Sequence, residues 1–177
     1  MDEIAYRVLD ASWHPRIAAL DRSETVSAEY ALRDGELVAD ERIIQIPQWS
    51  GEWLESTLQM IGGHLDDGAI LYGASAGDEL VGVAEVGTRL RGSQHDTIQL
   101  CFLLVDRAYR RRGIAAQLMA QCMAAARERG ARYLYISATP LSSALAFYHG
   151  QGARLAHEVD AELMALEPLD IHLEIPL

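Results

Sequence analysis

The sequence contains no lysine, and all 15 of its basic residues are arginine. A Walker A phosphate loop needs a lysine, and so does a Schiff base with a carbonyl substrate or with pyridoxal phosphate. Both kinds of site are therefore excluded. The 26 acidic residues give a formal net charge of −11. This negative field argues against general nucleic-acid binding and favours cationic partners.

Cysteine and long apolar runs are also scarce. Cys101 and Cys122 have no metal-type spacing, and we interpret them as reduced core thiols. No two of the histidines stand three or four residues apart, so we expect no metal. The start MDEIAYR has no basic or apolar leader, and no apolar run is long enough to cross a membrane. We expect a cytoplasmic protein that binds no membrane.

The length of 177 residues, of which 50% are hydrophobic, suits one core, so we expect a single domain over 1–177. The patterning predicts a mixed α/β (α+β) fold with a hairpin that turns at Asp34-Gly35. A strand, a helix that begins at Gly113 and a second strand then imply a parallel pair joined by a right-handed crossover. Strands are expected at 5–9, 26–32, 36–46, 70–75, 80–88, 98–105, 133–137, 153–157 and 171–175, helices at 13–20, 50–65, 113–130 and 141–149, and an acidic loop before the last strand.

Four arginines stand together just before the clearest helix. The six residues 107–112 contain Arg107, Arg110, Arg111 and Arg112 and no acidic residue, and Gly113 follows directly. The first N–H groups of a helix have no partner within the helix, and the helix dipole is positive there, so this is a place where a pyrophosphate fits. The alternative is a solvated basic face whose arginines pair with surface acids.

Two motifs carry a family resemblance. The stretch LLVDRAYRRRGIAAQLM resembles motif A of the GNAT superfamily of acyl-CoA-dependent N-acyltransferases, because Arg110, Gly113 and Ala115 fit its Gln/Arg-x-x-Gly-x-Gly/Ala signature. Downstream, ALAFYHGQGARL resembles the Phe-Tyr-x-x-x-Gly-Phe motif of the same superfamily. The resemblance covers about 80–155. It implies a mostly antiparallel sheet with a splayed parallel strand pair and flanking helices.

The resemblance also implies a cosubstrate, acetyl-CoA, and residues that bind it. The strand residues Leu103, Leu104 and Val105 would pair with the pantetheine arm. The loop and helix start would hold the pyrophosphate. Leu141 stands where relatives often carry an asparagine, so Ser142 or Ser143 could supply a hydroxyl. The pyrophosphate residues are Arg110, Arg111, Arg112, Gly113, Ile114 and Ala115.

Two residues are the expected catalysts. Tyr148 matches the tyrosine that protonates the departing thiolate in many relatives, although a tyrosine beside Phe147 can also be plain aromatic packing. Gln99 stands where many relatives have the basic glutamate, and an amide cannot accept this proton. Glu85 is the best substitute, ahead of Glu24 and Asp96, unless it faces solvent as strand glutamates often do.

The implied function is transfer of an acetyl group from acetyl-CoA to a primary amine by direct attack. No histidine adjoins either cysteine in the sequence, so a thiol nucleophile has little support. The acceptor is a small-molecule or peptide amine, and the acidic residues of 158–167 either attract it or are ordinary surface. Dimerisation is common in relatives, so a homodimer is possible. The alternatives are a non-catalytic acyl-CoA sensor and an unrelated nucleotide-phosphate binder.

Overall fold

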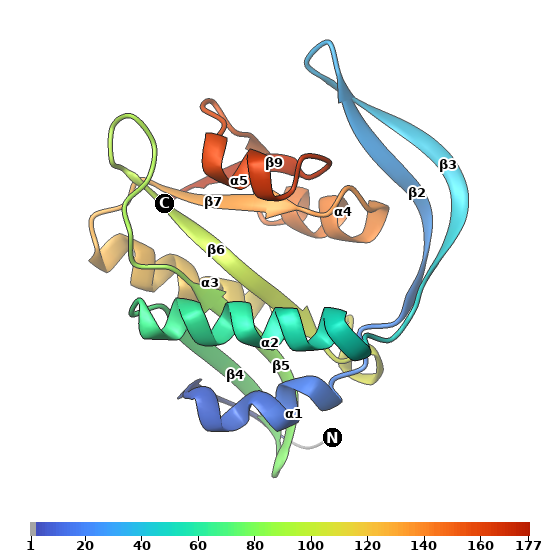
Figure 1. Ribbon diagram of the computed structural model, residues 1–177, viewed down its shortest axis with the longest axis vertical. Coiled ribbons are helices and arrows are strands. Elements are labelled where there is room, and N and C mark those ends of the chain that lie inside the picture. Colours follow the sequence, from blue (N-terminus) through green and yellow to red (C-terminus); the bar gives the residue numbers. More distant parts are fainter. Residues whose placement is uncertain (1–2) are drawn as a thin grey trace.

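The computed structural model describes residues 3–177 (Figure 1), so the first two residues of the expected domain, and of the start MDEIAYR, lie outside it. The main sheet has seven strands in the order β1-β4-β5-β6-β7-β9-β8. Its strands are β1 (Ile4–Leu9), β4 (Ile70–Ala76), β5 (Glu79–Val86), β6 (Thr97–Val105), β7 (Tyr133–Ala138), β8 (Arg154–Leu155) and β9 (Ile171–Pro176). The helices are α1 (His14–Ala19), α2 (Gly51–Asp66), α3 (Ile114–Glu128), α4 (Ser142–Gly150) and α5 (Ala161–Leu166).

Strand direction follows the expected pattern. In residues 3–177 every neighbouring pair of the main sheet is antiparallel except β6 and β7, which are parallel and joined through α3. The predicted mixed, mostly antiparallel sheet with one parallel pair is therefore confirmed. The last strand in the sequence, β9, lies between β7 and β8.

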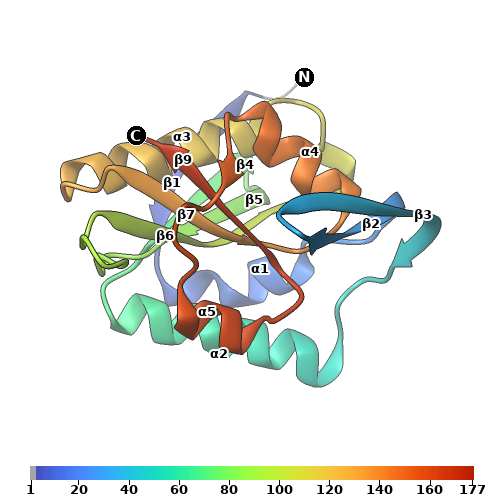
Figure 2. The same ribbon diagram turned by 90° about the horizontal axis from the view of Figure 1, so that it is seen from above.

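Helices cover both faces of the sheet (Figure 2). On one face α3 buries Leu118, Met119 and Cys122, which the sequence spaces along a single helical stripe. On the other face α1 and α2 bury Ile17 and Ile61 against the sheet. Full burial of a large aliphatic side chain contributes about 1.5–3 kcal/mol, so these two layers hold the sheet that carries the site.

A two-stranded hairpin, β2 (Glu24–Arg33) and β3 (Glu36–Ile46), projects from this body (Figure 1). Its turn has positive φ at Asp34 (51°) and Gly35 (83°), which is the backbone that the Asp-Gly pair favours. The hairpin reaches the start of α4, where the Tyr30 N–H donates to the Pro140 carbonyl at 2.7 Å. The predicted hairpin is confirmed.

Two expectations need correction. The segment expected to be an acidic loop contains α5, whose first turn is capped by Asp160, because its carboxylate accepts from the Leu163 N–H at 3.1 Å. The strand expected at 153–157 is only the two residues of β8. No helix in the described part of the chain is long and apolar enough to cross a membrane.

Candidate active site

The central feature of the site is a cleft of ≈ 1570 Å³ where β6 and β7 separate. The two strands pair from Thr97↔Tyr133 to Leu100↔Ile136 and no further. Beyond Leu100, β6 still pairs with β5, and Leu103 and Leu104 lie opposite Ala84 and Val83. The β6 edge that faces β7 therefore leaves backbone N–H and C=O groups open to a ligand.

Most of the expected cofactor residues border this cleft. They come from the end of β6, from the loop before α3, from the first turn of α3 and from α4. Arg112 is outside the lining: its guanidinium donates to the Ala108 carbonyl at 2.9 Å and lies 4.8 Å from the Tyr109 ring centroid. The expected cofactor residues that line the cleft are Leu103, Leu104, Val105, Arg110, Arg111, Gly113, Ile114, Ala115 and Ser143.

The start of α3 has the geometry of an anion site. Gly113 is its N-cap residue, in the left-handed conformation with φ 79°, and no side chain caps the helix. Apart from Gly113 and its two neighbours in the chain, no described residue has an atom within 4 Å of the point where a Cβ on Gly113 would stand. The first N–H groups of the helix therefore have no side-chain cap and are suited to an anionic group.

Arg110 has a different surrounding from its neighbours. Its guanidinium donates to three backbone carbonyls of the 21–23 segment, at 2.9 Å from Arg22 and 3.2 Å from Ser23, with Asp21 at 3.4 Å. Its Nε donates to the Val105 carbonyl at 3.0 Å. This side chain therefore joins the end of β6 to the N-terminal segment. Arg111 lines the cleft as well and is exposed.

Tyr148, on α4, lines the cleft beside Phe147, and the two ring centroids are 5.3 Å apart. In residues 3–177 the phenol oxygen has no hydrogen-bond partner. Burial raises the pKa of Tyr148, and the nearby Asp170 and Cys122 raise it further. The phenol therefore keeps its proton throughout the neutral range and is available as a donor.

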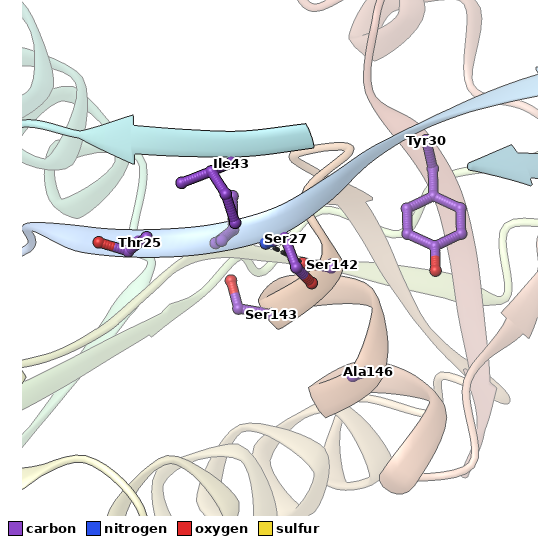
Figure 3. A pocket seen from close by; sticks show the side chains of 8 residues that line it. Thr25, Ser27, Tyr30, Ile43, Ser142, Ser143 and Ala146 are labelled. Atoms are coloured by element: carbon purple, nitrogen blue, oxygen red, sulfur yellow. Dashed lines mark hydrogen bonds between the residues drawn. The ribbon is translucent and has the colours of Figure 1, made fainter. Parts of the chain in front are cut away.

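A second, smaller cavity of ≈ 470 Å³ lies between the hairpin and the start of α4 (Figure 3). The Ser27 N–H donates to Ser142 Oγ across it at 3.3 Å. Ser143 borders both this cavity and the main cleft, so the hairpin reaches to the edge of the main cleft. The smaller cavity is lined by Thr25, Val26, Ser27, Tyr30, Ile43, Ser142, Ser143 and Ala146.

Glu85 does not face solvent, which rules out the surface alternative. Its side chain is 0% exposed, and it lies beneath the cleft rather than among the residues that line it. Oε2 lies 2.7 Å from His64 Nδ1, and among the described residues Oε1 has no hydrogen-bond partner. His64 does line the cleft, and sequence reasoning missed it because a lone histidine on a helix carries no local signal.

Cys101 lies close to this pair. One ligand atom each of His64, Glu85 and Cys101 lies within 4.8 Å of the others. Two ligands of one tetrahedral zinc ion stand about 3.3 Å apart. At 2.7 Å, the imidazole and carboxylate instead have the separation of a hydrogen bond. The expectation of no metal stays a prediction.

The thiols are poor nucleophiles. Burial raises the pKa of Cys101 and that of Cys122 to about 12, with the charge of Glu85 adding to both shifts. The thiolate, rather than the thiol, is the nucleophile. Both groups therefore stay protonated and unreactive at neutral pH.

The acids of the loop before β9 have local partners. Arg91 Nη1 donates to Asp160 at 2.7 Å and to Glu162 at 3.1 Å. Glu158 accepts from the Ser93 N–H at 3.0 Å. Glu162 lines the cleft, and so do Glu167 and Asp170 at the other end of α5. Burial raises the pKa of both Glu167 and Asp170.

Comparison with known proteins agrees with this geometry. The model of the acetyltransferase (GNAT) family matches residues 36–153. The chain belongs to this family. No curated protein matches the chain in a sequence search.

Solved structures of similar fold extend over the whole chain. A nourseothricin acetyltransferase has a TM-score of 0.73 at 18% identity, with 98% of each chain covered. A PaiA N-acetyltransferase from Thermoplasma acidophilum, in complex with coenzyme A, has a TM-score of 0.65 at 15% identity, with 99% of each covered. A ribosomal-protein-alanine N-acetyltransferase from Brucella melitensis has a TM-score of 0.60 at 18% identity, with 98% of this chain and 99% of that chain covered. At these identities the likeness shows the fold alone.

Proposed function

We propose that this GNAT-family protein is an acetyl-CoA-dependent N-acetyltransferase, and that the acceptor amine attacks the thioester directly. One observation carries the proposal. The open edge of β6, the uncapped start of α3 and the Tyr148 phenol all border one cleft. A structural neighbour that holds coenzyme A supports the choice of cosubstrate.

In this proposal, some residues of the cleft bind the cosubstrate and others take part in the chemical step. The backbone of Leu103 to Val105 would pair with the pantetheine arm, and Arg111 together with Gly113 to Ala115 would hold the diphosphate. Direct attack is favoured over an acyl-enzyme because burial keeps the thiols of Cys101 and Cys122 protonated. Tyr148 would give its proton to the departing thiolate, whose ordinary pKa is about 8.5.

The experiment is acetyl transfer from acetyl-CoA to a panel of small primary amines and N-terminal peptides. Free coenzyme A thiol is measured alongside the mass of the acceptor. We expect thiol release that requires both the protein and an amine, together with a singly acetylated product. Thiol release that does not depend on an amine would contradict transfer.

A sensor is the competing function, and Gln99 in the cleft is the observation that favours it. A sensor would bind coenzyme A and release no thiol above background. Thermal shifts with coenzyme A and with ATP distinguish the enzyme and the sensor, which both bind coenzyme A specifically, from a general nucleotide-phosphate site. A specific ligand at 100 times its dissociation constant adds about 2.7 kcal/mol to the free energy of unfolding.

A further inference from the structure

A buried carboxylate is joined to the cleft through an imidazole. Glu85 lies in the middle of β5, where the register places it opposite Leu71 on one side and Phe102 on the other. Its side chain is fully buried. A buried carboxylate without a partner is costly, and the hydrogen bond to His64 at 2.7 Å is what offsets that cost here.

His64 extends from α2 with one ring nitrogen on each side. Nδ1 meets Glu85, while the imidazole is 33% exposed and lines the cleft. In residues 3–177 no hydrogen-bond partner is found for Nε2. Trp53, Thr57 and Met60 of the same helix also line the cleft, so this face of α2 forms one wall. The hydrogen bond at Nδ1 fixes the ring and leaves Nε2 for a molecule in the cleft.

Charged groups from several elements act on this pair. The hydrogen bond to Glu85 raises the pKa of His64 against the effect of burial. The charges of Glu85 and Asp67 add to that rise, and Arg91 opposes it. Burial raises the pKa of Glu85, opposed by His64 and by His14 of α1. The protonated thiols of Cys101 on β6 and Cys122 on α3 are further titratable neighbours of Glu85.

We propose that His64 Nε2 takes the proton from the acceptor ammonium, and that Glu85 is the positioning residue that holds the imidazole. This inference rests on the proposed acetyltransferase function. His64 would supply the proton acceptor that the reaction needs, because the amide of Gln99 cannot accept this proton. Glu85 cannot reach a bound amine itself, because it is buried under His64.

The proton transfers balance. Neutral His64 keeps its Nδ1 proton in a hydrogen bond to Glu85. Its Nε2 lone pair accepts a proton as the ammonium N–H bond breaks. The free amine attacks the thioester carbon, the C–S bond breaks, and the thiolate takes the Tyr148 proton. The nitrogen loses its second proton as the amide forms, and that proton restores the phenol through water. His64 then releases its proton to solvent, so each turnover yields one amide, one thiol and one proton.

The test is the pH dependence of kcat/KM in His64→Gln, which keeps a polar side chain but cannot titrate. A base acts in its deprotonated form, so wild-type kcat/KM rises with pH through a pKa above about 6.5 and then levels. In His64→Gln we expect this rise to disappear. We also expect kcat at the plateau to fall about 10²-fold, while KM for acetyl-CoA stays unchanged.

Glu85→Gln separates positioning from a purely structural role. It removes the charge that raises the His64 pKa, so the inflection moves to lower pH and kcat falls less than in His64→Gln. The matched control is His95→Gln, which changes an exposed histidine outside the cleft and leaves the profile unchanged. Binding of coenzyme A, measured by thermal shift, verifies that each variant is folded.

The results of these measurements either support or overturn the role of His64. A folded His64→Gln variant that keeps the wild-type pH profile overturns the role of His64 and leaves the acetyltransferase function intact. A wild-type protein that binds acetyl-CoA but acetylates no amine overturns both. If His64→Gln does not fold, the Glu85→Gln inflection decides alone: a shift to lower pH supports the proposal, and an unmoved inflection overturns it.

Discussion

Tyr148 and His64 border the same cleft from different elements, and they are the proton donor and the proton acceptor of the proposed reaction. Burial raises the pKa of Tyr148 and so keeps its phenol protonated, and the phenol has no hydrogen-bond partner among the described residues, so its O–H is available to a group in the cleft. His64 is tied to a buried carboxylate, so it can hold one. The acid and the base are therefore two separate side chains, each suited to its role by its surroundings.

For Tyr148 we predict that Tyr148→Phe lowers kcat about 10²-fold and leaves the dissociation constant of acetyl-CoA nearly unchanged. The ring and its packing on Phe147 remain, and only the donated proton is lost. Steady-state kinetics with an accepted amine, together with calorimetric titration of acetyl-CoA, measure the two quantities.

Tyr72→Phe is the matched control. Tyr72 is also a partly buried tyrosine whose pKa burial raises, but it does not line the cleft. We expect wild-type turnover from this variant. Wild-type turnover from Tyr148→Phe as well would remove the phenol from the mechanism.

At the scale of elements, the start of α3 is the part of the site that the sequence predicts best. The glycine that the motif places there has φ 79°, a backbone that other residues adopt only with strain of about 1–2 kcal/mol. Gly130, at the other end of the same helix, has φ 82°, with no atom within 4 Å of a Cβ position. The two glycines therefore have similar backbone conformations, which would strain any other residue to a similar extent, but of the two only Gly113 lines the cleft.

This pair allows a controlled substitution. We predict that Gly113→Ala and Gly130→Ala each lower the free energy of unfolding by about 1–2 kcal/mol. Only Gly113→Ala should also weaken coenzyme A binding, because its helix start shifts relative to the ligand. Chemical denaturation and calorimetric titration give the two numbers. Equal coenzyme A affinities in the two variants would place the diphosphate elsewhere.

Other elements show where prediction from sequence stops. Motifs within a few residues predicted the strand, the helix and the tyrosine that the structure brings to one cleft, because their geometry is local. The bond between His64 and Glu85 joins residues 21 apart on a helix and a strand, and only packing brings them together. Arg110 was expected at the diphosphate, yet its donors go to carbonyls of a segment 87 to 89 residues away. The six-residue α5 is too short for periodicity to reveal.

At the scale of the whole molecule, the cleft depends on the late strands as much as on the motifs. The last strand, β9, pairs with β7 from Tyr133 to Ala138, along the whole of the strand from which Ser137 lines the cleft. Glu174 of β9 is opposite Tyr135 on one side and Arg154 on the other. Its side chain, 1% exposed, accepts from Arg154 Nε at 3.0 Å and from the His157 N–H at 3.2 Å. This carboxylate therefore joins β8, at the edge of the sheet, to β9, which is the neighbour of β7.

The pH dependence of stability follows from that carboxylate. Burial alone would raise the pKa of Glu174, but the hydrogen bonds from His157 and Arg154 outweigh it and hold the pKa below its ordinary value. A folded-state pKa below the unfolded one contributes stability above the unfolded value, about 4.3, and that stability is lost as pH falls through the folded value. We predict that Glu174→Gln lowers the free energy of unfolding at pH 7 by about 1–3 kcal/mol. The difference from wild type should narrow as pH falls below about 4.3, since the wild-type side chain is then becoming neutral too.

Urea denaturation of both proteins from neutral pH to pH 3 measures the difference, and Glu41→Gln, at an exposed position on β3, serves as the control with little effect at either end. A Glu174→Gln deficit that stayed constant across this range would mean that the amide disturbs packing rather than removing a charge. If the deficit follows pH as predicted, the wall of the cleft is held by an ionised group at its far edge. Coenzyme A affinity of wild type should then also fall in the acid range where Glu174 becomes protonated.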